Sequence, residues 1–236
     1  TLAALEPARR EDLLANQVRL ILSVGEPLTA GIVRRWQSFG HPARLFNVYA
    51  QTETAGVVTS YPIPEQLPAG DGILPVGLPV SDREVLLLDE DLQPVAPGES
   101  GVLYVGGPNL AREYLRSVEL TEAKFLRIQG SGFKVQGSPS QPESGWGSQI
   151  WYKTGDVARQ RLDAILEFVG RADNRLKIRG FRIEPGEIEA CLRETPDIRE
   201  AVVTAQTGPD GEPRLVAYVA RTNTTQSAVR SPQSFL

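Results

Sequence analysis

The chain has 236 residues, of which 41% are hydrophobic, 23% are charged and 7% are aromatic. Because this composition is close to the globular average, it argues against a wholly disordered, fibrous or disulfide-stapled protein. The length suits one large domain or two small ones. The formal net charge of -4 argues against a nucleic-acid partner, which usually requires a basic excess. No uncharged stretch reaches the roughly twenty residues of a membrane-spanning helix, so we also expect no membrane partner.

One cysteine, Cys191, and one histidine, His41, occur in the chain. A single cysteine cannot form an internal disulfide. A single imidazole makes Ser-His-Asp, Cys-His and multi-histidine metal chemistry unexpected. The chain opens without methionine and without a charged-then-apolar leader. We therefore expect a piece of a longer, cytoplasmic protein.

The first part of the chain, residues 1–65, predicts an α/β core. Its pattern gives a helix, a strand, a second helix and a second strand, at residues 11–18, 19–24, 30–39 and 45–49. The hydroxyl of Thr29 is a suitable cap for the second helix. Strand, helix and strand in this order indicate a βαβ unit with a parallel sheet.

Beyond Tyr61 the sequence changes to short strands separated by Gly and Pro, including strands at 84–88 and 102–105. This spacing is typical of a small barrel or meander, which we place at residues 66–172. Within it, a stretch near 126–150 is rich in Gly, Ser, Pro and Gln and predicts a disordered loop.

A small α/β lobe, residues 173–236, closes the chain. A helix is expected at 187–193 because the apolar pattern follows Pro185-Gly186. Two strands, 201–205 and 215–220, are expected on either side of a Gly-Pro-Asp-Gly turn.

A turn that is dense in hydroxyl groups follows the strand at 45–49. In an open α/β sheet, ligands bind just outside the carboxyl ends of the strands. The pair Thr52-Glu53 could therefore hold a phosphate and the Mg²⁺ that neutralises it. The same residues also fit a helix cap followed by a first-turn acid, and their spacing leaves both interpretations open.

Asp156 follows a glycine turn at the end of the polar loop. A carboxylate fixed there could accept hydrogen bonds from vicinal ribose hydroxyls, although Thr-Gly-Asp is also a common structural turn. The basic stretch at 170–180 is compatible with a nucleic-acid patch. The negative net charge and the alternation with Leu176 and Ile178 favour a solvated strand face instead.

Together, the order and the residues of these stretches are more specific than any one of them. The sequence resembles the adenylate-forming enzymes, and within them the amino-acid adenylation domains of non-ribosomal peptide synthetases. The matching stretches, in family order, are 24–28, 47–53, 98–115, 152–156 and 170–189. The most specific is Lys177-Ile178-Arg179-Gly180-Phe181-Arg182-Ile183-Glu184-Pro185-Gly186-Glu187-Ile188-Glu189, since acyl-CoA synthetases usually carry a different sequence there.

The resemblance implies the C-terminal half of an adenylation domain. The implied α/β fold combines the C-terminal part of a βαβ core, a small distorted β-barrel subdomain and the start of a small mobile α/β lobe. The implied enzyme is an AMP-forming ligase that uses ATP and Mg²⁺ to activate a small carboxylic acid, with an amino acid favoured, as an acyl-adenylate. The acyl group then passes to the phosphopantetheine thiol of a carrier domain. An acyl-CoA or fatty-acyl-AMP synthetase and a catalytically silent fragment are the alternatives. This chain alone should be inactive, because the main phosphate loop and a late lysine of the family are not in it.

The resemblance also implies nucleotide-binding residues, namely Asn47, Tyr49, Thr52, Asp156 and Arg171. Tyr49 would lie against the adenine ring, and Asp156 and Arg171 would contact the ribose. Thr52 would hydrogen-bond the α-phosphate. Thr52 and Glu53 are the implied catalytic pair, with Glu53 helping to hold Mg²⁺.

A substrate pocket and a hinge are implied as well. The pocket residues correspond to Leu22, Val24, Val48, Gly56 and Val57. All of them are uncharged, so a small or medium apolar side chain should be preferred. Asp173 matches the hinge about which the C-terminal lobe rotates.

The sequence departs from the family pattern at two positions that bear on geometry. Ala50-Gln51 stands where the family usually has Gly-Pro. Asp163-Ala164 stands where an Asp-Gly hairpin turn is expected, and alanine tolerates a positive φ poorly.

Overall fold

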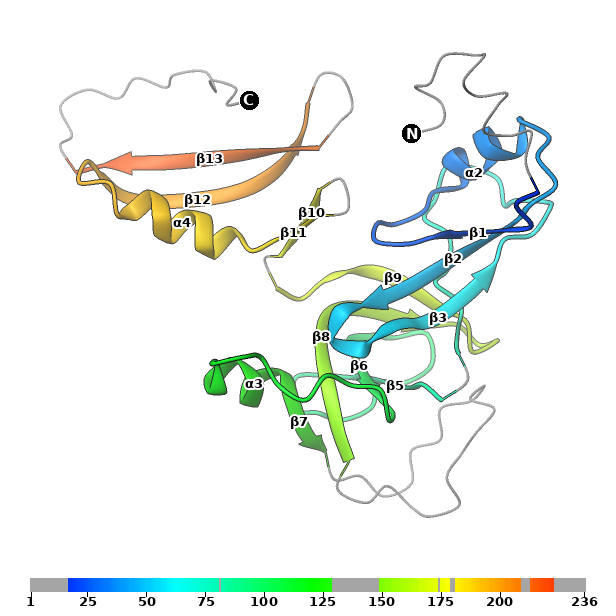
Figure 1. The fold of residues 1–236 in the computed structure, drawn as a ribbon, viewed down its shortest axis with the longest axis horizontal. Coiled ribbons are helices and arrows are strands. Elements are labelled where there is room, and N and C mark those ends of the chain that lie inside the picture. The colour runs from blue at the N-terminus through cyan, green and yellow to red at the C-terminus, as the bar shows by residue number, and fades with distance from the viewer. Residues whose placement is uncertain are drawn as a thin grey trace. The chain divides into compact units, whose positions relative to one another are not determined.

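The computed structural model describes residues 17–80, 82–128, 149–173, 175–178, 181–208 and 213–222. The chain divides into two compact units, Thr1–Ala172 and Asp173–Leu236 (Figure 1). The boundary expected between residues 65 and 66 stays a prediction. None of the helices in the described ranges is long and apolar enough to cross a membrane.

The first unit begins with the expected βαβ arrangement. Its elements are β1 (Leu20–Ser23), α2 (Ala30–Gln37) and β2 (Arg44–Gln51). β1 and β2 are parallel, with Leu22 opposite Phe46. The Thr29 hydroxyl accepts a hydrogen bond from the backbone N–H of Ile32 at 3.4 Å, which caps α2 as predicted. Most of the helix expected at 11–18 lies outside the described residues, and Gln17 and Val18 are not helical.

A short turn and a hairpin complete this first sheet. The 3₁₀ turn η2 (Thr52–Thr54) connects β2 to the antiparallel strand β3 (Gly56–Pro62), and β4 (Leu78–Pro79) adds to the edge of β3. α2 buries Ala30 and Val33 against Leu28 and Leu74.

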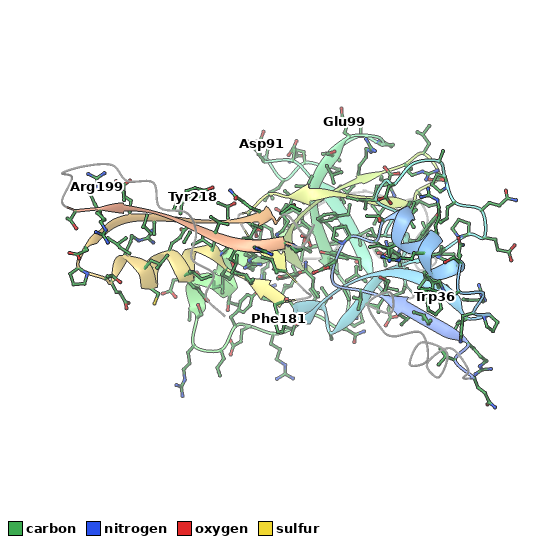
Figure 2. All side chains as sticks on the ribbon, turned by 90° about the horizontal axis from the view of Figure 1, so that it is seen from above. Trp36, Asp91, Glu99, Phe181, Arg199 and Tyr218 are labelled. Carbon is green, nitrogen blue, oxygen red and sulfur yellow. The ribbon has the colours of Figure 1, made fainter. Side chains whose placement is uncertain are left out.

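The only histidine of the chain, His41, lies shortly after the C-terminal end of α2. Its ring lies 5.4 Å from that of Trp36, which is labelled in Figure 2. The Nδ1 atom of His41 accepts a hydrogen bond from the backbone N–H of Ala43 at 3.1 Å. These contacts give His41 a structural role, and the expected absence of histidine chemistry stays a prediction.

The second sheet of the first unit contains five strands. They are β5 (Glu84–Leu88), β6 (Ser100–Gly106), β7 (Phe125–Ile128), β8 (Gln149–Gln160) and β9 (Leu166–Arg171). β6 pairs with β8 along one edge, whereas β7 and β9 pair with opposite ends of β8. Figure 1 shows β8 curling as it passes between these partners. This curled antiparallel sheet is the barrel-like part of the predicted α/β fold, and that fold class is confirmed.

One hydrophobic core joins the two sheets. Tyr49 on β2 and Val58 on β3 pack with buried residues of the second sheet: Val85, Leu103, Val105, Ala158 and Leu166. A β-bridge between Gly77 and Leu166 also connects them. The strands that carry the candidate site are therefore fixed to one another by packing as well as by hydrogen bonds.

Two local expectations can be compared with the strands and turns. Residues 126–128 and 149–150, which the prediction gave to the disordered loop, belong to β7 and β8 because their backbones pair in register. Residues 129–148 of that loop lie outside the described residues. Ala164, between β8 and β9, has a φ of 65°, the left-handed conformation that glycine would adopt more easily. α3 (Val118–Lys124) precedes β7.

The second unit contains a short hairpin, a helix and a long hairpin. β10 (Leu176–Ile178) pairs with β11 (Phe181–Ile183), and β12 (Ile198–Thr207) pairs with β13 (Pro213–Arg221), both antiparallel. α4 (Pro185–Arg193) lies along β12, as Figure 1 shows. The Glu189 carboxylate on α4 accepts a hydrogen bond from the backbone N–H of Val203 at 2.9 Å. The predicted helix and both predicted strands are confirmed. The helix and β13 are slightly longer than expected, whereas β12 has 10 residues and extends beyond the predicted 201–205 at both ends.

Candidate functional site

Asp156 is the centre of the candidate site. It lies on β8 directly opposite Arg171 on β9. The Arg171 guanidinium donates to Oδ1 of Asp156, and the pair is largely buried. The Thr154 hydroxyl accepts from the Asp156 backbone N–H at 3.0 Å and donates to the carbonyl of Leu103 at 2.7 Å. The strand pairing therefore fixes both the backbone and the carboxylate of Asp156.

Two side chains from β2 reach the other oxygen of the same carboxylate. The Tyr49 hydroxyl donates to Oδ2 of Asp156. The amide Nε2 of Gln51 donates to Oδ2 at 2.6 Å and to the Tyr49 hydroxyl at 2.7 Å. Burial, and then the negative charge of Asp156, raise the pKa of Tyr49 well above its ordinary value. Tyr49 is therefore a neutral hydrogen-bond donor at physiological pH.

The position of Tyr49 bears on the expected adenine contact. Its ring is only 7% exposed and packs in the core between the two sheets. Its hydroxyl, and not a ring face, is what reaches the Asp156 carboxylate. Stacking of adenine on Tyr49 stays a prediction, and it requires one face of the ring to become accessible.

Glu53 forms a second buried centre in the turn after β2. The Tyr114 hydroxyl donates to Oε1 of Glu53 at 2.6 Å, and it lies 3.4 Å from the Tyr152 hydroxyl. The Glu53 carbonyl accepts from the backbone N–H of Ala111 at 2.8 Å. Burial, followed by the hydrogen bond to Glu53, raises the pKa of Tyr114 above its ordinary value. Tyr114 thus acts as a permanent donor that holds one oxygen of Glu53.

The oxygen atoms of Thr52 and Glu53 at this turn fit a magnesium ion that takes most of its ligands from water and phosphate. Thr52 is exposed and Glu53 is 5% exposed, and both offer the hard oxygen atoms that Mg²⁺ prefers. Across the described ranges, no three His, Cys, Asp or Glu side chains come together as a metal cage. A single carboxylate with substrate phosphates is an ordinary ligand set for Mg²⁺.

Asn47 belongs to the supporting structure in the described contacts. It is 3% exposed, and its Nδ2 donates to the carbonyls of Pro75 at 2.8 Å and Leu74 at 3.4 Å. These bonds tie β2 to the segment before β4. A direct contact of Asn47 with nucleotide stays a prediction.

The five expected pocket residues are not enclosed equally. Leu22 and Val24 are 56% and 55% exposed, whereas Val48 is 5% exposed. The strand register places Leu22 and Val48 on the same face of the sheet, since Leu22 lies opposite Phe46. Gly56 is exposed and has a φ of 112°, and Val57 is half-buried. Their role as a substrate pocket stays a prediction.

The hinge candidate, Asp173, is the first residue of the second unit. Its Oδ1 accepts from the backbone N–H of Arg175 at 3.3 Å. The Nε atom of Arg175 also lies 2.5 Å from Oε1 of Glu184. These contacts organise the start of the unit, and the hinge function stays a prediction.

Two residues of the site were not among those expected. The sequence marked Gln51 only because Ala50-Gln51 replaces the usual Gly-Pro of the family. It marked Tyr114 only because this residue belongs to the matching stretch 98–115. Both act through partners that are distant in sequence: Gln51 through Asp156 and Tyr114 through Glu53. The only sequence signal for these two residues is a polar or aromatic side chain inside a family motif. Such a signal does not identify the distant residue to which the side chain bonds.

Comparison with known families matches residues 2–115 to the AMP-binding enzymes. The chain belongs to this family. A dimodular nonribosomal peptide synthase of Bacillus subtilis is 39% identical over 208 residues, which cover 87% of this chain and 8% of that protein.

Two solved structures of other proteins are similar in fold. The crystal structure of IdnL1 matches with a TM-score of 0.74 and 28% identity, covering 94% of this chain and 42% of that chain. Holo-PA1221, an NRPS protein containing adenylation and PCP domains, matches with a TM-score of 0.71 and 27% identity, covering 85% and 32%. The chain thus spans less than half the length of each of these relatives. Its assignment to the C-terminal half of an adenylation domain stays a prediction.

Proposed function

We propose that this chain is part of an ATP-dependent adenylation domain that activates an amino acid as an acyl-adenylate for transfer to a phosphopantetheine carrier thiol. The observation that carries the proposal is the convergence of Tyr49, Gln51 and Arg171 on the buried carboxylate of Asp156. The similarity to nonribosomal peptide synthetases supports an amino acid as the substrate and a carrier domain as the partner. A cytoplasmic location is part of the same proposal.

The Asp156 centre would hold the nucleoside. A carboxylate accepts hydrogen bonds at two oxygens, and each ribose hydroxyl can donate one. Arg171 fixes the orientation of this carboxylate through Oδ1, and Tyr49 does so through Oδ2. Because the acceptor is oriented before the nucleotide arrives, less conformational entropy is lost on binding.

The turn after β2 would serve the reacting phosphate. Thr52 is exposed, so its hydroxyl is able to donate to an α-phosphate oxygen. Glu53 would help to hold Mg²⁺ through its carboxylate, which Tyr114 positions. When bound, Mg²⁺ offsets the negative charge that develops on the phosphate as pyrophosphate leaves. Tyr114 fixes Glu53 in one position, which preserves this charge arrangement during the reaction.

ATP–pyrophosphate exchange by the full-length protein tests the proposal. The twenty amino acids should be compared one at a time, with carrier-bound thioester measured for each acid that supports exchange. We expect exchange with one or a few acids that have small or medium apolar side chains. Exchange only with fatty or aryl acids, followed by transfer to free CoA, would assign an acyl-CoA or fatty-acyl-AMP synthetase instead. Absence of exchange and of ATP binding would leave a catalytically silent protein.

A further inference from the structure

Among the described residues, the Gln51 side chain forms two hydrogen bonds through its amide nitrogen and none through its amide oxygen. Its Nε2 donates to the Tyr49 hydroxyl at 2.7 Å and to Oδ2 of Asp156 at 2.6 Å. Within the described part of the chain, its carbonyl oxygen Oε1 is buried and has no hydrogen-bond partner. A buried acceptor without a donor lowers stability and calls for an explanation.

The orientation of this amide follows from its neighbours. A carboxylate only accepts hydrogen bonds, and the Tyr49 hydroxyl already uses its proton for Asp156. Both neighbours of the amide therefore need a donor, which only Nε2 can supply. A reversed amide would place Oε1 against the Asp156 carboxylate and lose both bonds. The free acceptor is thus a consequence of the side chains around Gln51.

The chemistry of Oε1 limits what it can bind. It needs a hydrogen-bond donor, so phosphate oxygens are unsuitable partners, whereas hydroxyl groups are suitable. The other end of the same amide contacts the Asp156 carboxylate at 2.6 Å. The acceptor Oε1 thus belongs to the amide that contacts the Asp156 carboxylate, and the adjacent hydroxyls of one ribose form a matching pair of donors.

We propose that Gln51 is a specificity-determining residue whose Oε1 accepts a hydrogen bond from one ribose hydroxyl of ATP while Asp156 accepts from the other. This inference rests on the proposed function, because it requires nucleotide at Asp156. The proposed role of Gln51 requires a side-chain amide, which proline, the usual family residue at this position, lacks.

Binding of ATP, 2′-deoxy-ATP and 3′-deoxy-ATP to the full-length protein tests the proposal by titration calorimetry. We expect the wild-type protein to bind ATP about threefold to tenfold more tightly than either deoxy analogue, the value of one hydrogen bond. In Gln51→Met, which keeps the length of the side chain, the preference over one analogue should disappear. The preference over the other analogue should persist, because it depends on Asp156.

Gln93→Met is the matched control, since Gln93 is exposed and its amide bonds only the Asp91 carbonyl in the described contacts. It should leave both preferences unchanged. Wild-type protein that binds both analogues as tightly as ATP would overturn the inference, as would a Gln51→Met variant that keeps both preferences. The wild-type comparison requires no variant, so it can overturn the inference even if Gln51→Met does not fold. ATP binding without ribose discrimination refutes this inference alone, whereas failure of the wild-type protein to bind ATP refutes the proposed function.

Discussion

The carboxylates of Asp156 and Glu53 are both buried, but they are held in different ways. Asp156 lies within a paired strand, and its partners come from β2 and from the neighbouring strand β9. Glu53 lies in a 3₁₀ turn and is held by Tyr114, which belongs to a segment without regular structure. The first carboxylate is thus held by side chains from two strands, whereas a donor from a loop contributes to holding the second.

This difference suits the two tasks proposed for them. A residue that positions the nucleoside benefits from a rigid scaffold, since its geometry should stay the same before and after the reaction. A residue near the reacting phosphate acts on the charge that develops there during the reaction, so it affects the rate more than the affinity. Substitutions at the two centres should therefore affect different measured quantities.

The largest effect is expected for Asp156→Ala. Removal of the carboxylate takes away the ribose acceptor, so ATP affinity should fall about 100-fold in the full-length protein. Arg171 would also lose its carboxylate partner in a largely buried position, which should lower the free energy of unfolding by about 3 kcal/mol. Calorimetric titration and chemical denaturation measure the two effects. Asp91→Ala, at an exposed turn, is the control, and unchanged ATP affinity in Asp156→Ala would contradict the ribose assignment.

A smaller and different effect is expected for Tyr114→Phe. The ring remains, but Glu53 loses the donor at its Oε1. The exchange rate kcat should fall about tenfold, because a hydrogen bond to a charged group contributes about 1.5 kcal/mol or more. KM for ATP should change less than about twofold, since the Asp156 centre is intact. Tyr104→Phe, a buried tyrosine in another cluster, should change neither constant, and an equal rise in KM would contradict the proposed separation of the two centres.

The sequence predicted the elements of this fold more completely than the contacts of its site. The βαβ unit, the β5 strand and the helix after Pro185 follow from local periodicity and turn residues, which a short window contains. The bond between Tyr114 and Glu53 joins residues 61 positions apart, and that between Gln51 and Asp156 joins residues 105 apart. Such pairs depend on how two sheets pack. No local pattern specifies that packing, so only the family resemblance directed attention to these segments.

The two tyrosines give a pH-dependent test of the same comparison. The ordinary pKa of a tyrosine is 10.0, and the folded protein raises the pKa of both Tyr49 and Tyr114 above it. Each hydroxyl therefore contributes stability that is fully present below about pH 10 and is lost as the pH rises above that value. The free energy of unfolding of wild-type protein should fall by up to about 1.36 kcal/mol per pH unit for each tyrosine in this range. Urea denaturation at several pH values should show that the free energy of unfolding falls less steeply with pH in Tyr49→Phe and Tyr114→Phe than in wild-type protein. An equal dependence on pH would contradict the raised pKa of these two tyrosines.

The smallest effect is expected for Ala164→Gly, in the turn that joins β8 to β9 and so brings Asp156 opposite Arg171. Ala164 has a φ of 65°. A residue with a Cβ atom pays about 1–2 kcal/mol for this conformation. Part of the gain from glycine is offset because glycine makes the unfolded chain more flexible. The free energy of unfolding should therefore rise by about 0.5–1 kcal/mol, with ATP affinity unchanged, because the strand register that fixes Asp156 does not depend on the turn residue.

Ala96→Gly provides the matched control at an exposed position without a positive φ, and it should lower stability slightly. If Ala164→Gly lowers stability as Ala96→Gly does, the turn is not strained. If Ala164→Gly also weakens ATP binding, the position of Asp156 depends on this turn. Strand pairing alone would then not fix Asp156, and the proposed contrast with Glu53 would be weaker.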